Sequence, residues 1–285
     1  MKMNGIKKDM EGKFMLDLRT VVVTQQHIDN MFDTSWFIHS QIFDDVLLVS
    51  NKSTNCIVLK TTEGLILIDA IFPKKEMFDA IVSAIKAIGW DPAQIKKFVI
   101  THGHFDHCGC GKWIIDAFHP QTYMSKIDYD FWSEHPFFPD KKETWKDFDV
   151  DNFVGDGDSI TLGDKTIDVY FTPGHTPGGL SFIFPVTDLG VRHTAALWGG
   201  TNPPNNIKDI LTYFKSLDYF MEQAERKNVD VAISNHPFID NSFQKMEFAN
   251  ARLSHMPNVY IIGTDGYRHY SQIFKNMCYA RMENM

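Results

Sequence analysis

The densest group of side chains able to carry out chemistry is the segment 101–107, which reads Thr-His-Gly-His-Phe-Asp-His. A strand that ends where this segment begins projects His102 and His104 to the same side, because side chains alternate along a strand. The chain then turns, so that Asp106 and His107 face the same point from another direction. Imidazole nitrogens and carboxylate oxygens are ligands that suit zinc, and also iron or manganese. The spacing therefore predicts a metal site.

Two further histidines follow predicted strands, where ligands are expected. His175 lies in the segment 172–179, Thr-Pro-Gly-His-Thr-Pro-Gly-Gly, and His236 lies in Ser-Asn-His-Pro. Prolines and glycines beside each one restrict the backbone, as a pre-organised metal site requires. Either histidine alone is typical of a structural residue, whereas with the first group both become candidate ligands. Cys108 and Cys110 adjoin the first group. We interpret them as small buried residues under the metal loop in preference to a further ligand or a redox pair.

The elements that must position these side chains are short strands and three amphipathic helices. Runs rich in β-forming residues and broken by turn residues predict strands, and apolar residues at helical spacing predict helices over 74–88, 208–227 and 265–282. Many strands with helices between and after them indicate an α/β fold in which two sheets pack face to face with helices outside. The predicted strands are Val46–Val49, Cys56–Lys60, Leu65–Asp69, Lys97–Thr101, Ile160–Leu162, Ile167–Phe171, Leu180–Phe184, His193–Leu197 and Val229–Ile233.

Length and charge narrow the class of protein. A chain of 285 residues fits one large domain, residues 41–285, preceded by an irregular arm, residues 1–40, packed on the body. The net charge of −8 and the lack of a basic run argue against nucleic acid as a partner. No apolar stretch reaches the roughly 20 residues that span a bilayer, so no membrane is expected. The N-terminus contains no apolar signal core, and four cysteines do not form a disulfide framework. We expect a cytoplasmic protein, or an exported one whose signal was removed.

An aromatic-rich stretch between Lys126 and Asp156 fits neither the helical nor the strand period. A long irregular segment with this much aromatic surface is either a packed surface loop or a lid over a pocket. Its composition alone favours packing.

The histidine groups together resemble the signature of the metallo-β-lactamase superfamily, HxHxDH followed by two later histidines. The resemblance runs from about Val46 to the end of the chain. It implies an αβ/βα four-layer sandwich, with the metals in a groove at one edge of the two sheets. It also implies two zinc ions per chain, with one as the alternative. The first ion would be held by His102, His104 and His175, and the second by Asp106, His107 and His236.

One departure narrows the resemblance. Glyoxalase II and acyl-homoserine lactonases have a bridging aspartate at the end of the strand between the last two histidines, and other β-lactamase subclasses have a cysteine there. Residues 193–202 of this chain contain neither. The third subclass of metallo-β-lactamases also lacks that ligand, and its Asn-Pro, long helix, strand and His-Pro resemble Asn202-Pro203 through His236-Pro237. The chain is therefore most similar to that subclass.

This resemblance implies metal-assisted hydrolysis of an amide-type carbonyl in a small molecule, a β-lactam being the family case. Asp106 would orient a metal-bound hydroxide, and Asp69 and Thr176 are candidates for fixing the ligand tautomers. The alternatives are hydrolysis of lactones, esters or thioesters at the same site, and an iron-bound enzyme similar to a sulfur dioxygenase. The aromatic stretch lies where the subclass carries loop insertions beside its site, which predicts a lid. The expected substrate contacts are the oxyanion donors Thr201, Asn202 and Asn206, and Trp132 and Phe138 in the lid.

Overall fold

A computed structural model describes residues 6–8, 14–16, 29, 32–135, 141–283 and 285. Most of the expected arm, residues 1–40, lies outside these residues. Strand β3 (Ile38–Phe43) nevertheless begins before the expected boundary and is part of the first sheet. Phe32 and Trp36 also contact the body, since their rings lie 4.2 and 4.8 Å from those of Phe72 and Phe243.

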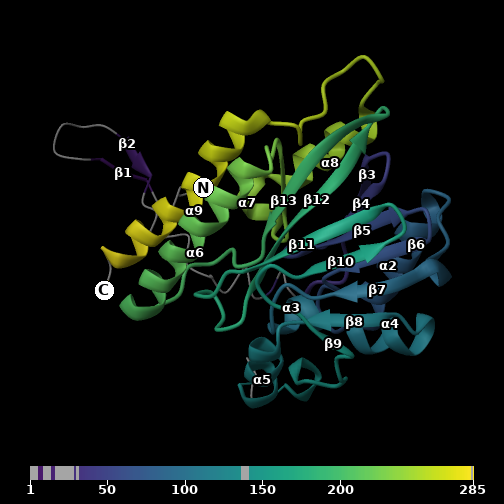
Figure 1. Cartoon of the computed structure of the whole chain (residues 1–285), viewed down its shortest axis with the longest axis horizontal. Coiled ribbons are helices and arrows are strands. Elements are labelled where there is room, and N and C mark those ends of the chain that lie inside the picture. The colour runs from purple at the N-terminus through teal and green to yellow at the C-terminus, as the bar shows by residue number, and fades with distance from the viewer. Residues whose placement is uncertain (1–5, 9–13, 17–28, 30–31, 136–140, 284) are drawn as a thin grey trace.

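The strands of the body form two sheets (Figure 1). Strands β3 to β9 make up one sheet and β10 to β14 the other, each in chain order. In the first sheet β3 to β6 are antiparallel, whereas β6 to β9 are parallel. In the second sheet β10 to β13 are antiparallel, and β14 runs parallel to β13. Parallel neighbours need a crossover connection, and helices α2, α4 and α6 supply three of them.

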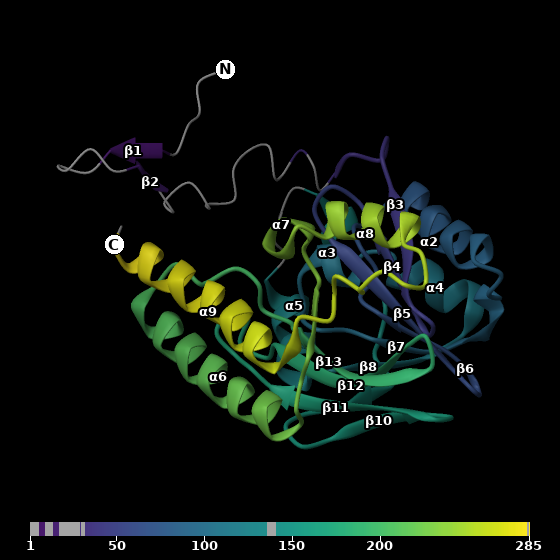
Figure 2. The same cartoon turned by 90° about the horizontal axis from the view of Figure 1, so that it is seen from above.

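Alternating side chains divide the core into three apolar layers. Leu48 and Phe182 belong to the layer between the two sheets. Leu47, on the other face of β4, packs in the layer under α2 and α4, and Ile183 packs in the layer under α6 and α9. Figure 2 shows α6 and α9 side by side along one sheet, with α2 and α4 on the far side of the other. The fold is the expected α/β sandwich with helices outside both sheets.

The predicted strands correspond to β4 to β7 and β10 to β14 to within a few residues, whereas β1, β2, β3, β8 and β9 were not predicted. Strands in the described part are β1 (Ile6–Lys8), β2 (Phe14–Leu16), β3 (Ile38–Phe43), β4 (Val46–Ser50), β5 (Asn55–Thr61), β6 (Gly64–Ile68), β7 (Ile95–Val99), β8 (Gln121–Met124), β9 (Asn152–Phe153), β10 (Ser159–Leu162), β11 (Lys165–Phe171), β12 (Leu180–Asp188), β13 (Val191–Trp198) and β14 (Val231–Ser234).

The three expected helices are present as α2, α6 and α9. Sequence spacing did not predict the shorter helices, among them α5, which lies within the aromatic-rich stretch. None of the helices in the described ranges is long and apolar enough to cross a membrane. The helices are α2 (Lys75–Ala87), α3 (Phe105–Cys108), α4 (Gly111–Phe118), α5 (Lys126–Glu134), α6 (Ile207–Arg226), α7 (Pro237–Asp240), α8 (Ser242–Ala251) and α9 (Gly263–Met282), with 3-10 turns η2 (Pro92–Gln94) and η3 (Lys142–Thr144).

Candidate metal centre

The candidate ligands lie in the segments that follow β7, β11 and β14, with Asp106 and His107 in the short helix α3, and the loop after β4 supports the second group. Two groups of three side chains could each hold a metal ion, because within each group the potential ligand atoms lie within 4.8 Å of one another. These are the same two groups that the sequence resemblance implies. The first holds His102, His104 and His175, and the second holds Asp106, His107 and His236.

In the first group, hydrogen bonds at Nδ1 determine which ring nitrogen is available. His175 Nδ1 donates to the carbonyl oxygen of Asn202 at 2.6 Å. Thr101 Oγ1 donates its only hydrogen to the Asp69 carboxylate at 2.9 Å. His102 Nδ1, 2.9 Å from the same hydroxyl, must therefore be the donor in that contact. Its Nε2 then carries no hydrogen and presents a lone pair. This atom is buried and has no hydrogen-bond partner among the described residues. A buried acceptor of this kind fits a metal ligand.

The second group leads to the same conclusion by a different contact. His107 Nδ1 lies 2.7 Å from Asp69 Oδ2, and His236 Nδ1 lies 2.8 Å from the Ser53 carbonyl oxygen. Both partners only accept, so both Nδ1 atoms donate. When both rings are neutral, the two Nε2 lone pairs face each other at 3.2 Å, beside Asp106 Oδ2 at 3.5 and 4.0 Å. Ligand atoms of a tetrahedral zinc ion lie about 3.3 Å apart. The residues present therefore fit zinc, because a cation would turn this repulsion into attraction.

Burial keeps four of the histidines in the neutral form that binds metals. It lowers the pKa of His102 and of His175 well below the usual value. The pKa of His104 and that of His236 fall to about 4 for the same reason. Protons therefore compete weakly with a metal for these rings at neutral pH.

The pKa values of Asp106 and His107 are set mainly by their charged neighbours. Burial raises the pKa of Asp106, but the neighbouring imidazoles, led by His107, lower it more, and the result is about 2. Burial lowers the pKa of His107, yet the Asp106 and Asp69 carboxylates outweigh it and the pKa is raised. Asp106 is consequently an ionised, buried carboxylate at neutral pH.

The loop between β4 and β5 supports the second group, and sequence reasoning did not identify it. Thr54 Oγ1 donates to Asp106 Oδ2 at 3.1 Å, and the Ser53 carbonyl holds His236. Asn51 Oδ1 accepts from the backbone amides of both residues, at 2.9 and 2.7 Å, which fixes the loop. The only sequence signal for this supporting loop is the polar run 50–55 between two apolar strands, and such a run by itself predicts no more than a turn.

Of the two residues expected to fix ligand tautomers, the structure supports one. Asp69 contacts His107 directly and reaches His102 through Thr101. The Thr176 hydroxyl instead donates to Asp128 Oδ2 at 2.7 Å, so it contacts no ligand ring.

The three expected oxyanion donors are engaged in local structure. Thr201 is buried, and its hydroxyl donates to Asn235 Oδ1 at 2.7 Å. Asn206 is the N-cap of α6, where its side chain accepts from the Asp209 amide at 3.0 Å. Asn202 contributes its backbone carbonyl to His175. For Thr201 and Asn206 these contacts correspond to structural roles, and oxyanion contacts by the three residues stay a prediction.

The expected lid residues do not line an open surface where they are described. Trp132 is only 3% exposed and packs edge-on against Phe148 at 4.9 Å. Phe138 lies outside the described residues. The neighbour of Trp132 on α5, Phe131, was not singled out by the sequence, yet its ring lies 6.1 Å from that of His104. Trp132 therefore belongs to the core behind the ligand loop, and Phe131 is the aromatic ring beside the candidate ligands.

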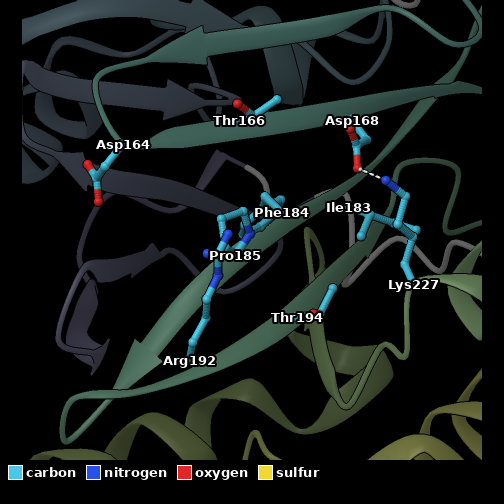
Figure 3. Close-up of a pocket in the computed structure, with 9 residues that line it drawn as sticks. All are labelled: Asp164, Thr166, Asp168, Ile183, Phe184, Pro185, Arg192, Thr194 and Lys227. Atoms are coloured by element: carbon cyan, nitrogen blue, oxygen red, sulfur yellow. Dashed lines mark ion pairs between the residues drawn. The ribbon is translucent and has the colours of Figure 1, made fainter.

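A separate hollow lies on the helix-facing side of the second sheet, where β11 to β13 are not covered (Figure 3). Arg192 and Thr194 of β13 and Asp168 of β11 line it, and Asp168 pairs with Lys227 at 2.8 Å. None of the candidate ligands lines this hollow, so it is distinct from the metal centre.

The sequence places the chain in a known family. Residues 50–190 match the Metallo-beta-lactamase superfamily. The chain belongs to this superfamily and is a metallo-β-lactamase-like hydrolase. A similar curated protein is the N-acyl homoserine lactonase AttM of Agrobacterium fabrum, 26% identical over 192 residues that cover 62% of this chain and 72% of the lactonase. A hydroxyacylglutathione hydrolase of Buchnera aphidicola is 32% identical over 126 residues, or 44% of this chain and 41% of that protein.

Solved structures show the same fold over nearly the whole body. BJP-1, a subclass B3 metallo-beta-lactamase of Bradyrhizobium japonicum, superposes with a TM-score of 0.71 over 86% of this chain and 95% of the other, at 23% identity. At that identity the likeness establishes the fold alone.

Proposed function

We propose that this chain is a di-zinc hydrolase acting on an amide-type carbonyl of a small molecule, of which a β-lactam ring is the leading case. The observation that carries the proposal is a pair of three-residue ligand groups with no bridging acid. Strand β13 ends at Trp198, and a Cβ on the next residue, Gly199, would lie 1.9 Å from the Leu180 carbonyl oxygen. No side chain therefore fits at Gly199, and residues 199–202 after the strand, Gly-Gly-Thr-Asn, offer no acid to bridge the two groups as the aspartate of lactonases and glyoxalase II does. The ligand pattern thus favours the third β-lactamase subclass.

Zinc bound at the two groups would supply a Lewis acid for the carbonyl and acidify a water molecule to a pKa near 7. The residues of the chain orient the reactants. Asp106, ionised and held by Thr54, accepts a hydrogen bond from the attacking water and directs it at the carbonyl. His104 and His175 are only partly buried, so substrate approaches from the side of the first group. Phe131, beside His104, forms an apolar wall there.

Hydrolysis of a lactone, ester or thioester at the same site is the second candidate. It is favoured by the similarity to the lactonase AttM over 62% of this chain. Both reactions begin with the same attack on a carbonyl and differ in the leaving atom. It is nitrogen in an amide, oxygen in a lactone or ester, and sulfur in a thioester.

The test is a substrate panel on the zinc-loaded protein, with metals measured by mass spectrometry. We expect about two zinc ions per chain and measurable opening of a reporter cephalosporin. A kcat/KM above about 10⁵ M⁻¹s⁻¹ for the cephalosporin, within the range of evolved enzymes, would make β-lactam hydrolysis the main activity. Cleavage of lactones or thioesters without any cephalosporin cleavage would establish the second candidate. Iron in place of zinc would contradict the di-zinc proposal and favour the dioxygenase-like alternative.

A further inference from the structure

Asp128 is a buried carboxylate of α5 that no ligand motif contains. Its side chain is completely buried, and burial raises the pKa of the carboxyl against the effect of its hydrogen bonds. A buried carboxylate is costly to keep unless its oxygens are hydrogen-bonded, so its partners indicate what it does.

Among the described residues, this carboxylate has three hydrogen-bond donors, and all three belong to the two loops that hold the first ligand group. Asp128 Oδ2 accepts from the Gly103 amide at 2.7 Å, and Gly103 lies between His102 and His104. The same oxygen accepts from Thr176 Oγ1 at 2.7 Å, and Oδ1 accepts from the Gly178 amide at 2.6 Å. Thr176 and Gly178 follow His175 in the loop after β11. The carboxylate therefore bridges the loop of His102 and His104 to the loop of His175.

The first turn of α5 is also wedged between these loops. A Cβ on Gly103 would lie 2.7 Å from the Asp128 carbonyl oxygen and 2.9 Å from Trp132 Cβ. A Cβ on Gly178 would lie 2.4 Å from the Asp128 amide nitrogen and from Ser125 Oγ. Glycine is thus required at both contacts, which means that the helix sets the separation of the loops by backbone contact as well as by hydrogen bonds.

In the described part of the chain, no hydrogen bond of the Asp128 carboxylate reaches the second ligand group. Its rings and carboxylate are held by Asp69, Ser53 and Thr54, as described above. We propose that Asp128 is a positioning residue that joins the two loops of the first ligand group and thereby sets metal affinity at that site and not at the second. The inference rests on the proposed metal-binding role of the two groups and not on the identity of the substrate.

The test measures zinc affinity at each site separately by chelator competition. His236→Ala leaves the first group intact, and His104→Ala leaves the second. In the His236→Ala background, Asp128→Asn should weaken zinc binding by about 10- to 100-fold, the usual effect of losing a hydrogen-bonding partner behind the ligands. The amide keeps the size of the carboxylate but turns one acceptor into a donor facing a loop amide. In the His104→Ala background the same substitution should leave zinc affinity unchanged.

Asp130→Asn is the matched control, because Asp130 lies on the same helix, has a side chain that is 49% exposed and pairs with Lys126 on the surface. It should change neither affinity. If Asp128→Asn does not fold, Thr176→Val removes one of the three donors and should weaken only the first site, to a smaller extent. Equal weakening at both sites, or unchanged affinity at the first site in a folded variant, would overturn the inference. Neither result depends on which substrate is hydrolysed, so failure of the proposed activity would be seen independently.

Discussion

At the scale of single residues, the protonation of the histidines decides what the centre can do. Four Nδ1 atoms donate to a carbonyl, a carboxylate or a hydroxyl, which directs four Nε2 lone pairs into the site. This is the arrangement by which proteins fix metal-binding imidazoles. Two predictions follow from the assignment of ligands and from their pKa values.

Removing one ligand from each group should separate the two sites. His104→Ala should lower the zinc content from about two to about one by emptying the first site, and His236→Ala should do the same at the second. Metal content after gel filtration, measured by mass spectrometry, checks both. Retention of two tightly bound ions by His236→Ala would show that this residue is not a ligand.

Acid should destabilise the metal-free protein through its buried histidines. The pKa of His236 is about 4 in the folded chain and about 6.5 when unfolded, so between these values the unfolded chain binds more protons. The free energy of unfolding then rises with pH in this window and is lost as the pH falls from about 6.5 towards 4. Urea denaturation of the metal-free protein at several pH values measures this slope. His236→Ala should reduce it, and an unchanged slope would contradict the pKa of this residue.

At the scale of elements, α5 combines two functions on its two faces. Trp132 faces inward, onto Phe148 in the apolar layer under α2 and α4, whereas Phe131 lies beside His104 and stacks on His135 at 5.2 Å. The helix is therefore a wedge behind the ligand loop on one side and a wall of the site on the other. The lid expected from the position of the aromatic stretch does not describe Trp132, which packs in the core as the composition alone indicated.

Substitutions of two neighbouring residues on α5 should affect different properties, stability for Trp132 and substrate binding for Phe131. Trp132→Ala should lower the free energy of unfolding by about 3–5 kcal/mol, because it opens a cavity in the core, with KM little changed in the folded fraction. Phe131→Ala should change stability by much less and raise KM for substrates with an apolar group next to the carbonyl. Denaturation curves and steady-state kinetics on both variants check this. If Trp132→Ala raised KM strongly but left the free energy of unfolding almost unchanged, the prediction that Trp132 is part of a lid would be supported instead.

At the scale of the whole molecule, the candidate metal centre takes its ligands from both sheets. They lie in the segments that follow β7 in the first sheet and β11 and β14 in the second. Metal bound only by the folded chain stabilises it, so the centre should act as a clamp between the two halves of the sandwich.

Chelation should accordingly lower the melting temperature, and added zinc should restore it. With free zinc at about 100 times its dissociation constant, each site contributes about 2.7 kcal/mol. Differential scanning calorimetry with and without chelator measures the shift, and His104→Ala should show a smaller one. An unchanged melting temperature in a chain shown to be free of metal would contradict metal binding at the interface of the sheets.

The sequence by itself was sufficient for the α/β class and for most strand positions, and it singled out four candidate ligands within 101–107, whereas His175 and His236 became candidates only in combination with these four. The physical reason is that these signals are local. Strand and helix patterns repeat every two or about 3.6 residues, and imidazoles and carboxylates grouped within seven positions need no tertiary contact to be noticed. The signal for α5 was weaker, because its apolar residues serve two different environments and follow no single period.

Only the tertiary structure decided which groups support the ligands. Asp128 lies 25 residues from Gly103 and 50 from Gly178, and Thr54 lies 52 residues from Asp106. Such contacts depend on how β4, α5 and the loop after β11 meet once the sheets have packed, and no spacing in the sequence records that. The same holds for Gly199, whose need for glycine arises from the Leu180 carbonyl on a neighbouring strand. Side chains that bind metal are recognisable by their chemistry, whereas those that hold them in place are ordinary residues whose role depends on what folding brings beside them.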